Sequence, residues 1–186
     1  MRIKDADKQQ RIKEAMVRLF LREGIDGTSI SKIAREAGVS PATIYVYYDS
    51  KEEMLADVFR EYSRQPYQYL MELIRPEMDG RELIDTIVRG CYTFNTEHED
   101  IFSFVEQCSR NPYLAEQVCE QDCSYDIFDR IHAYQRRGEL RYCSDWNLGA
   151  VLFAPVRFLA MNRSTAETDE RQLEELIRMV QALLLM

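Results

Sequence analysis

The sequence contains few of the residues that interrupt helices. Its 186 residues include 7 glycines and 5 prolines, too few for a chain rich in turns. Strand-like alternation of apolar and polar residues, internal repeats and low-complexity tracts are also not evident. We therefore expect an all-α fold.

The sequence also lacks a long apolar run. The N-terminal residues MRIKDADKQQR have no apolar core of the kind that a signal peptide needs. The longest apolar stretch, 148–161, contains Pro155 and Arg157 and is shorter than a membrane span. An odd number of cysteines, five, favours a reducing compartment. We expect a cytoplasmic protein without a membrane partner.

Motifs of catalysis and metal binding are missing. We find no Gly-rich phosphate loop, no nucleophile elbow and no paired His and Asp arrangement. Cys119 and Cys123 are four residues apart, but His98 and His132 are not at ligand spacing. Buried, inert cysteines are the simpler interpretation. We expect no enzyme, no metal and no cofactor; an enzyme with an incidental helical corner is the alternative.

The charge is unevenly distributed. A net charge of −8 argues against a nucleic-acid partner until the chain is divided. Residues 1–51 hold ten Lys and Arg against seven Asp and Glu, whereas residues 52–186 hold 14 against 25. A basic N-terminal part predicts a DNA-binding domain over 1–50, followed by a second domain over 51–186.

Residues 28–51, TSISKIAREAGVSPATIYVYYDSK, have the pattern of two short helices joined by a tight turn. Thr28 is expected to cap the first helix. Gly38 permits the turn, and Ser40 with Pro41 is a typical start for the second. The buried face of the first helix is predicted to contain Ile30, Ile33, Ala34 and Ala37. This is the helix-turn-helix plan, although a purely structural helical corner has the same spacing.

The second helix, expected over 41–47, has one face suited to base contacts. At 100° per residue, Ile44 and Tyr48 point toward the first helix, and Ala42 and Val46 point away. Small and apolar side chains fit thymine methyl groups, and hydroxyl and ammonium donors suit phosphate oxygens. The predicted DNA-binding residues are Thr28, Ser40, Pro41, Ala42, Thr43, Tyr45, Tyr47 and Lys51.

The stretch from Gln10 to Leu55 resembles the DNA-binding signature of the TetR (tetracycline repressor) family of bacterial transcription regulators. The shared landmarks are Phe20, Gly24, Thr28, Ile33-Ala34, Ala37-Gly38-Val39-Ser40, Ile44-Tyr45, Tyr48 and Lys51-Glu52. Pro41-Ala42 stands where many members have a glycine before Thr or Ser, so the operator sequence cannot be inferred from a relative. The resemblance implies nine helices, dimerisation through the last two, and a small-molecule cavity between the fourth and eighth.

Caps and apolar spacing predict the helices of the whole chain. Beyond the two described, they are 5–23, ended by Gly24; 51–75, with a break near Pro66; 81–96; 99–109; 112–137, opened by Asn111-Pro112; 145–162, capped by Ser144; and 169–185, capped by Thr168.

The last two helices are apolar over more than one face, and such a surface must be covered. A helix buried within one subunit would satisfy this, but helix-turn-helix proteins read palindromic DNA as dimers. We therefore expect a homodimer. Its predicted interface contains Phe153, Leu173, Leu176, Val180 and Leu183.

The region 81–137 is rich in aromatic residues, which form plain core or line a ligand cavity. The predicted ligand-binding residues are Tyr92, Phe94, Phe102, Glu106, Tyr125 and Phe128. Carboxylates among these rings (Glu97, Glu106 and Asp126) favour a cationic ligand; if they are solvated, a neutral compound or a fatty-acid derivative is favoured. We expect a repressor that binds a palindromic DNA operator through helix 41–47 and is released by a small apolar or aromatic inducer. A ligand-independent DNA-binding protein of the same fold is the alternative.

Overall fold

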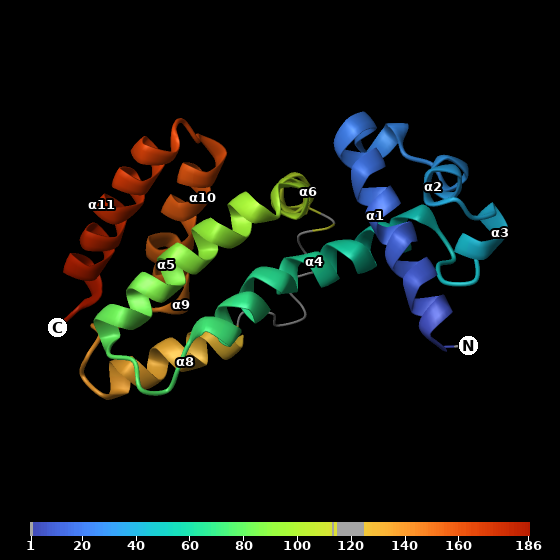
Figure 1. Cartoon of the computed structure of the whole chain (residues 1–186). Helices are drawn as coiled ribbons and strands as arrows, with labels where there is room; N and C mark the ends of the chain where they lie inside the picture. The colour runs from blue at the N-terminus through green and yellow to red at the C-terminus, as the bar shows by residue number, and fades with distance from the viewer. Residues whose placement is uncertain (1, 113, 115–124) are drawn as a thin grey trace. The chain divides into compact units, whose positions relative to one another are not determined.

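The computed structural model describes residues 2–112, 114 and 125–186, and these residues form an all-α fold (Figure 1). Its helices are α1 (Arg2–Gly27), α2 (Ile30–Ala37), α3 (Pro41–Ile44), α4 (Lys51–Leu73), α5 (Gly80–Glu97), α6 (Glu99–Ser109), α8 (Tyr125–Arg136), α9 (Asp145–Leu148), the π-helix η1 (Gly149–Phe153), α10 (Ala154–Met161) and α11 (Ala166–Leu184). With the consecutive α9, η1 and α10 taken as one, the described part holds nine helices, and the predicted fold class is confirmed. Its only strand-like contact is an isolated bridge between Leu140 and Leu185.

The described residues divide into two compact units. Unit 1 contains 2–63, 99–112 and 114, and unit 2 contains 64–98 and 125–186. The division passes through α4, and α6 belongs with the N-terminal helices. The boundary predicted between residues 50 and 51 stays a prediction, because compactness does not establish which part folds alone. None of the described helices is long and apolar enough to cross a membrane.

The core of unit 1 joins α6 to α1 and α4. Phe104 of α6 is fully buried, and its ring centroid lies 5.1 Å from that of Phe20 and 6.0 Å from that of Tyr62. Both pairs meet edge to face, an arrangement that adds about 0.5–1.5 kcal/mol beyond area burial. Helix α6 is therefore a structural part of unit 1, although α5 separates it in sequence from the helices it contacts.

The core of unit 2 contains a π turn with a chemical cause. Pro155 has no N–H, and in a regular helix its ring would collide with the carbonyl of Val151. The helix avoids this collision by forming a wider π turn over Gly149–Phe153, where the Ala154 amide donates to the Gly149 carbonyl, five residues back. The Phe153 ring packs edge-on against Tyr67 and Phe128, with centroids 5.8 and 6.1 Å apart.

Two helix caps differ from the prediction. Ser29 caps α2, because its hydroxyl accepts from the Lys32 amide, whereas the hydroxyl of buried Thr28 donates to the Gly24 carbonyl at 2.8 Å. Likewise Thr165 caps α11, so Thr168 lies inside the first turn. In both cases a neighbouring hydroxyl occupies the position that the pattern gave to another residue.

Two helix lengths also differ. The predicted break near Pro66 is wrong: α4 is continuous from Lys51 to Leu73, and buried side chains such as Tyr62 and Leu70 hold it on both sides of the proline. Helix α3 ends at Ile44 rather than 47, and the chain continues in turns in which the Val46 and Tyr47 amides bond three residues back.

Part of the helix predicted over 112–137 is seen as α8, which ends just before Gly138, where φ is +74°. Asn111 accepts from the Leu114 amide, as expected of a cap. Cys119 and Cys123 lie outside the described residues.

Gly24 interrupts α1 with φ 72° and ψ −179°, a backbone conformation that residues with a Cβ rarely adopt. We expect Gly24→Ala to lower the free energy of unfolding by about 1–3 kcal/mol. Gly149→Ala is the matched control, because Gly149 has ordinary φ and open space around its Cα. Urea unfolding of both variants measures the effect, and an equal change in the two would contradict the backbone explanation.

Candidate DNA interface

Helices α2 and α3 form the predicted helix-turn-helix within unit 1. Gly38, in the left-handed conformation (φ 68°), ends α2, and its amide donates to the carbonyls of Ala34 and Arg35. Two residues later Ser40 caps α3, and Pro41 occupies the first helical position. The Ser40 hydroxyl accepts a hydrogen bond from the Thr43 amide at 3.2 Å. The connection is therefore short and fixed at both ends.

The segment 41–48 has a buried side and an exposed apolar side. Ile44 and Tyr48 are buried, whereas Tyr45 is 56% exposed and Val46 is 77% exposed. Ala42, one turn before Val46, is also exposed. Within the described part of unit 1, Tyr45 and Val46 are the exposed large hydrophobic residues. An apolar surface held outward on a short helix and the turn that follows it is suited to contact with thymine methyl groups.

A buried phenol attaches this segment to the rest of unit 1. The Tyr48 hydroxyl donates to Asp57 of α4 at 3.1 Å, and burial raises the pKa of Tyr48 well above its ordinary value, so the group stays a donor. The Asp57 carboxylate also lies 3.8 Å from the ammonium of buried Lys13, which contacts Glu61 as well. The position of α3 thus depends on a polar cluster shared by α1 and α4.

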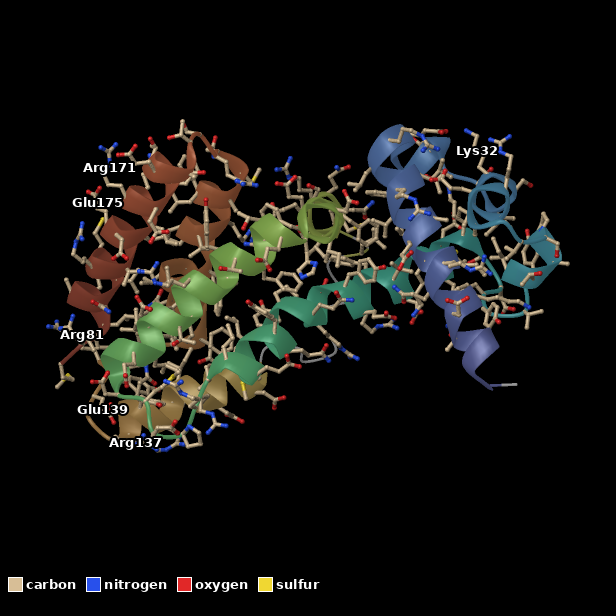
Figure 2. The ribbon with its side chains drawn as sticks, viewed as in Figure 1. Lys32, Arg81, Arg137, Glu139, Arg171 and Glu175 are labelled. Carbon is tan, nitrogen blue, oxygen red and sulfur yellow. The ribbon has the colours of Figure 1, made fainter. Side chains whose placement is uncertain are left out.

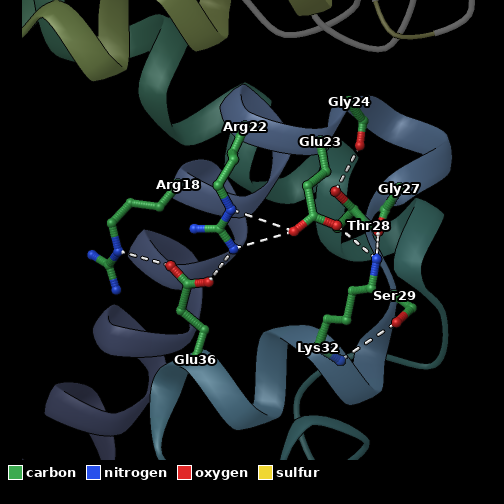
Figure 3. Close-up of polar contacts among 9 residues, drawn as sticks. All are labelled: Arg18, Arg22, Glu23, Gly24, Gly27, Thr28, Ser29, Lys32 and Glu36. Atoms are coloured by element: carbon green, nitrogen blue, oxygen red, sulfur yellow. Dashed lines mark hydrogen bonds and ion pairs between the residues drawn. The ribbon is translucent and has the colours of Figure 1, made fainter.

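Ion pairs attach α2 to α1 (Figure 3). Lys32 and Glu36, one turn apart on α2, both bind side chains of α1 rather than each other. The contacts are Arg18 to Glu36 (3.3 Å), Arg22 to Glu36 (2.8 Å), Lys32 to Glu23 (2.6 Å) and Lys32 to the Gly27 carbonyl (2.8 Å). Several charges sharing partners in this way orient α2 more firmly than an isolated surface pair would.

The predicted DNA-binding residues differ in accessibility. Ser40, Pro41, Ala42 and Tyr45 are exposed, and Thr43 and Tyr47 are half-buried. Thr28 is buried with its hydroxyl bound to a carbonyl. The Lys51 ammonium donates to the Ile25 carbonyl at 3.0 Å and lies 3.8 Å from Glu52. Part of its hydrogen-bonding capacity is therefore used within unit 1.

The predicted ligand-binding residues are divided between the units. Phe102 and Glu106 lie on α6 in unit 1 and are half-buried; Tyr92, Phe94 and Phe128 lie in unit 2. Tyr125 begins α8, and its side chain lies outside the description. Burial raises the pKa of Tyr92, whose hydroxyl also interacts with buried Asp169, so this tyrosine links α5 to the start of α11. The ring of Phe94 contacts the rings of Tyr69 and His98.

The predicted dimer residues divide by exposure. Leu173 and Val180 are 3% and 2% exposed, so their side chains already belong to the core of unit 2, and Leu176 and Phe153 are half-buried in the same cluster. Leu183 is exposed. The other exposed large hydrophobic residues of α10 and α11, which the sequence interpretation did not select, are Phe158, Met161 and Met179. The sequence did contain a signal for these residues, because their helical spacing puts them on the face opposite the core.

A His–Asp pair that the sequence did not reveal lies in unit 2. His132 Nε2 is 2.6 Å from an Asp145 oxygen, which ties α8 to the first turn of α9. Among the residues that the structure describes, no three His, Cys, Asp or Glu side chains are grouped so that they could hold a metal ion.

Comparison with known proteins identifies the family. Residues 12–58 match the family model described as bacterial regulatory proteins, tetR family. A Haemophilus influenzae protein described as an uncharacterized HTH-type transcriptional regulator is 27% identical over 151 residues, which cover 78% of this chain and 77% of that protein. Residues 12–58 therefore form a DNA-binding domain of the tetR type. The comparisons support a helix-turn-helix transcriptional regulator, and the resemblance inferred from the sequence is confirmed.

Solved structures of transcription regulators have the same fold. A regulator from Marinobacter aquaeolei matches with a TM-score of 0.82 and 23% identity over 100% of this chain and 99% of that one. FadR from Bacillus subtilis, solved in complex with stearoyl-CoA, matches with a TM-score of 0.73 and 22% identity over 92% and 96% of the two chains.

The ion pairs of this tetR-family head predict a pH effect. The hydrogen bond from Arg22 lowers the pKa of Glu36 against the opposing effect of burial, and Arg18 lowers it further. A carboxyl whose pKa is lower in the folded state adds stability above its unfolded pKa, ordinarily 4.5, and loses it as the pH falls through the folded value.

We therefore expect Glu36→Gln to reduce the free energy of unfolding at pH 7 by up to about 1 kcal/mol. The difference from wild type should disappear below the folded pKa. Urea unfolding between pH 7 and 3 measures this, with exposed Glu52→Gln as the control. A difference that persists at the acid end would mean that charge is not the cause.

Proposed function

We propose that this tetR-family regulator is a homodimeric repressor that reads a short palindromic operator through segment 41–47 and is released by a small apolar or aromatic ligand bound in unit 2. The observation that carries the DNA part is the exposed apolar face of Ala42, Tyr45 and Val46, held outward by buried Ile44 and Tyr48. A rigid reading face is what direct readout of base edges requires. Changes at Ala42 or Thr43 should therefore alter which bases are preferred.

The second exposed apolar surface supports the dimer. On α10 and α11, Phe158, Met161, Met179 and Leu183 are each more than half exposed. Arg171 and Glu175 of α11 point outward as well (Figure 2), which suits a polar rim around an apolar centre. A two-fold dimer would cover this surface and place two heads on half-sites about 34–36 Å apart, one turn of DNA.

We expect Leu183→Glu to give a folded monomer that no longer binds the operator tightly, because the charge would be buried without a partner in the dimer only. Val180→Glu, three residues earlier and buried in the core of the protomer, should instead unfold unit 2. Sedimentation, circular dichroism and gel shifts with the DNA upstream of the protein's own gene separate these outcomes. A wild-type monomer at micromolar concentration would contradict the dimer.

The aromatic cluster of Tyr67, Phe128 and Phe153 supports an apolar ligand in unit 2. All three rings are half-buried and meet through Phe153 on the π turn. Glu97 and Asp126 are exposed, which favours solvated groups over the counter-charge of a buried cation. FadR carries stearoyl-CoA in the same fold, which makes acyl compounds a reasonable class to test beside neutral aromatics. Helix α4, shared by both units, is the proposed connection, and a coupling of about 1–3 kcal/mol would change operator affinity 5–150-fold.

A true inducer should raise the melting temperature and release operator DNA over the same concentration range, because it must bind the DNA-free form better. We expect this from neutral aromatic or acyl compounds in a panel that also holds lipophilic cations. Phe128→Ala should weaken both effects; Tyr142→Ala, which truncates an aromatic side chain that is 88% exposed, should weaken neither. If no class released DNA, the alternative of a ligand-independent DNA-binding protein would replace the ligand part. Absence of any operator binding would instead favour the other alternative, an enzyme with an incidental helical corner.

A further inference from the structure

The cations of unit 1 differ in what they already bind. In the described part of the segment before residue 52, carboxylates or carbonyls hold the side chains of Arg11, Lys13, Arg18, Arg22, Lys32 and Lys51. Arg35 is exposed on α2 and has no polar partner among the described residues. Lys8 has none there either, but it lies on α1, outside the helix-turn-helix. Arg35 is thus the cation of the helix-turn-helix that has no polar partner in the part of the chain that the structure describes.

The position of Arg35 on α2 directs its side chain away from the protein. The buried residues of this helix are Ile33, Ala34 and Ala37. At 100° per residue, Arg35 lies close to the direction opposite their centre. Lys32 lies at a similar angle on the other side of that direction and Glu36 lies on a flank, but α1 binds both side chains and both are half-buried. The Arg35 guanidinium is therefore the charged group of α2 that is exposed without a contact to α1.

The geometry points to Arg35 as a contact to the phosphate backbone of DNA, and this rests on the proposed operator binding. In a helix-turn-helix the first helix crosses the DNA backbone while the second enters the major groove. A guanidinium matches phosphate oxygens with two parallel donors, and an unpaired one can bind without first breaking an internal contact. Lys32 would have to leave Glu23 and the Gly27 carbonyl to do the same.

This difference between two cations of one helix makes the test direct. Each phosphate contact contributes about 0.9 to the slope of log K against log[salt]. Arg35→Ala should reduce the magnitude of the slope by about 0.9 for each head bound, and weaken operator and unrelated DNA alike. Arg35→Lys should restore most of the slope. Arg35→Ala should leave the melting temperature unchanged, because the side chain makes no polar contact in the described structure.

Lys32→Ala is the matched control. It removes the ion pair with Glu23 and the hydrogen bond to Gly27, so it should lower the melting temperature and leave the salt slope as in wild type. If Arg35→Ala retained the wild-type slope and affinity, the inference would be wrong while operator binding stood. A loss of slope in Lys32→Ala but not in Arg35→Ala would also overturn it. A wild-type protein without DNA affinity would refute the proposed function itself.

Discussion

The DNA-binding motif depends on the attachment of a helix that is too short to exist alone. Helix α3 has four residues, whereas isolated helices below about 12–15 residues are marginal in water. Its conformation is therefore supplied by what it contacts: the apolar side chain of Ile44 in the core of unit 1, and the Tyr48 hydroxyl on Asp57. Because Asp57 also lies near Lys13, the recognition segment, α1 and α4 share a single polar support. If segment 41–47 reads bases as proposed, recognition would depend on this support as much as on the exposed residues.

The helix-turn-helix could be predicted because its signals are local. A left-handed glycine, a serine cap and a proline at the first helical position act within a few residues, and Gly38, Ser40 and Pro41 behave as expected. The caps that were misplaced lie where hydroxyl residues crowd together. Thr28 and Ser29 are adjacent, and only the fold determines that Thr28 bonds back to the Gly24 carbonyl. Segment ends therefore stay the least predictable part of an otherwise correct all-α interpretation.

Sites made by packing could not be predicted in the same way. Leu173 and Leu183 have the same chemistry and lie on the same helix, yet one is buried within the protomer and the other is exposed. Periodicity identifies apolar faces but not the surface that covers each of them. Charge has the same limit: Lys32 and Glu36 have the i, i+4 spacing of an internal pair, but both bind α1. The net charge of the N-terminal part therefore overstates the charge that is directed toward DNA.

The burial of Phe104 between Phe20 and Tyr62 bears on how such regulators can be recombined. A fragment that stopped after α4 would contain the whole reading motif but would leave the apolar surface covered by α6 open to water. Such a fragment would be prone to self-association, and a chimaera that grafted it onto a foreign body would need to bring α6 with it. The residues proposed to contact DNA are contiguous in sequence, but the domain that holds them also needs α6, which lies much later in the chain.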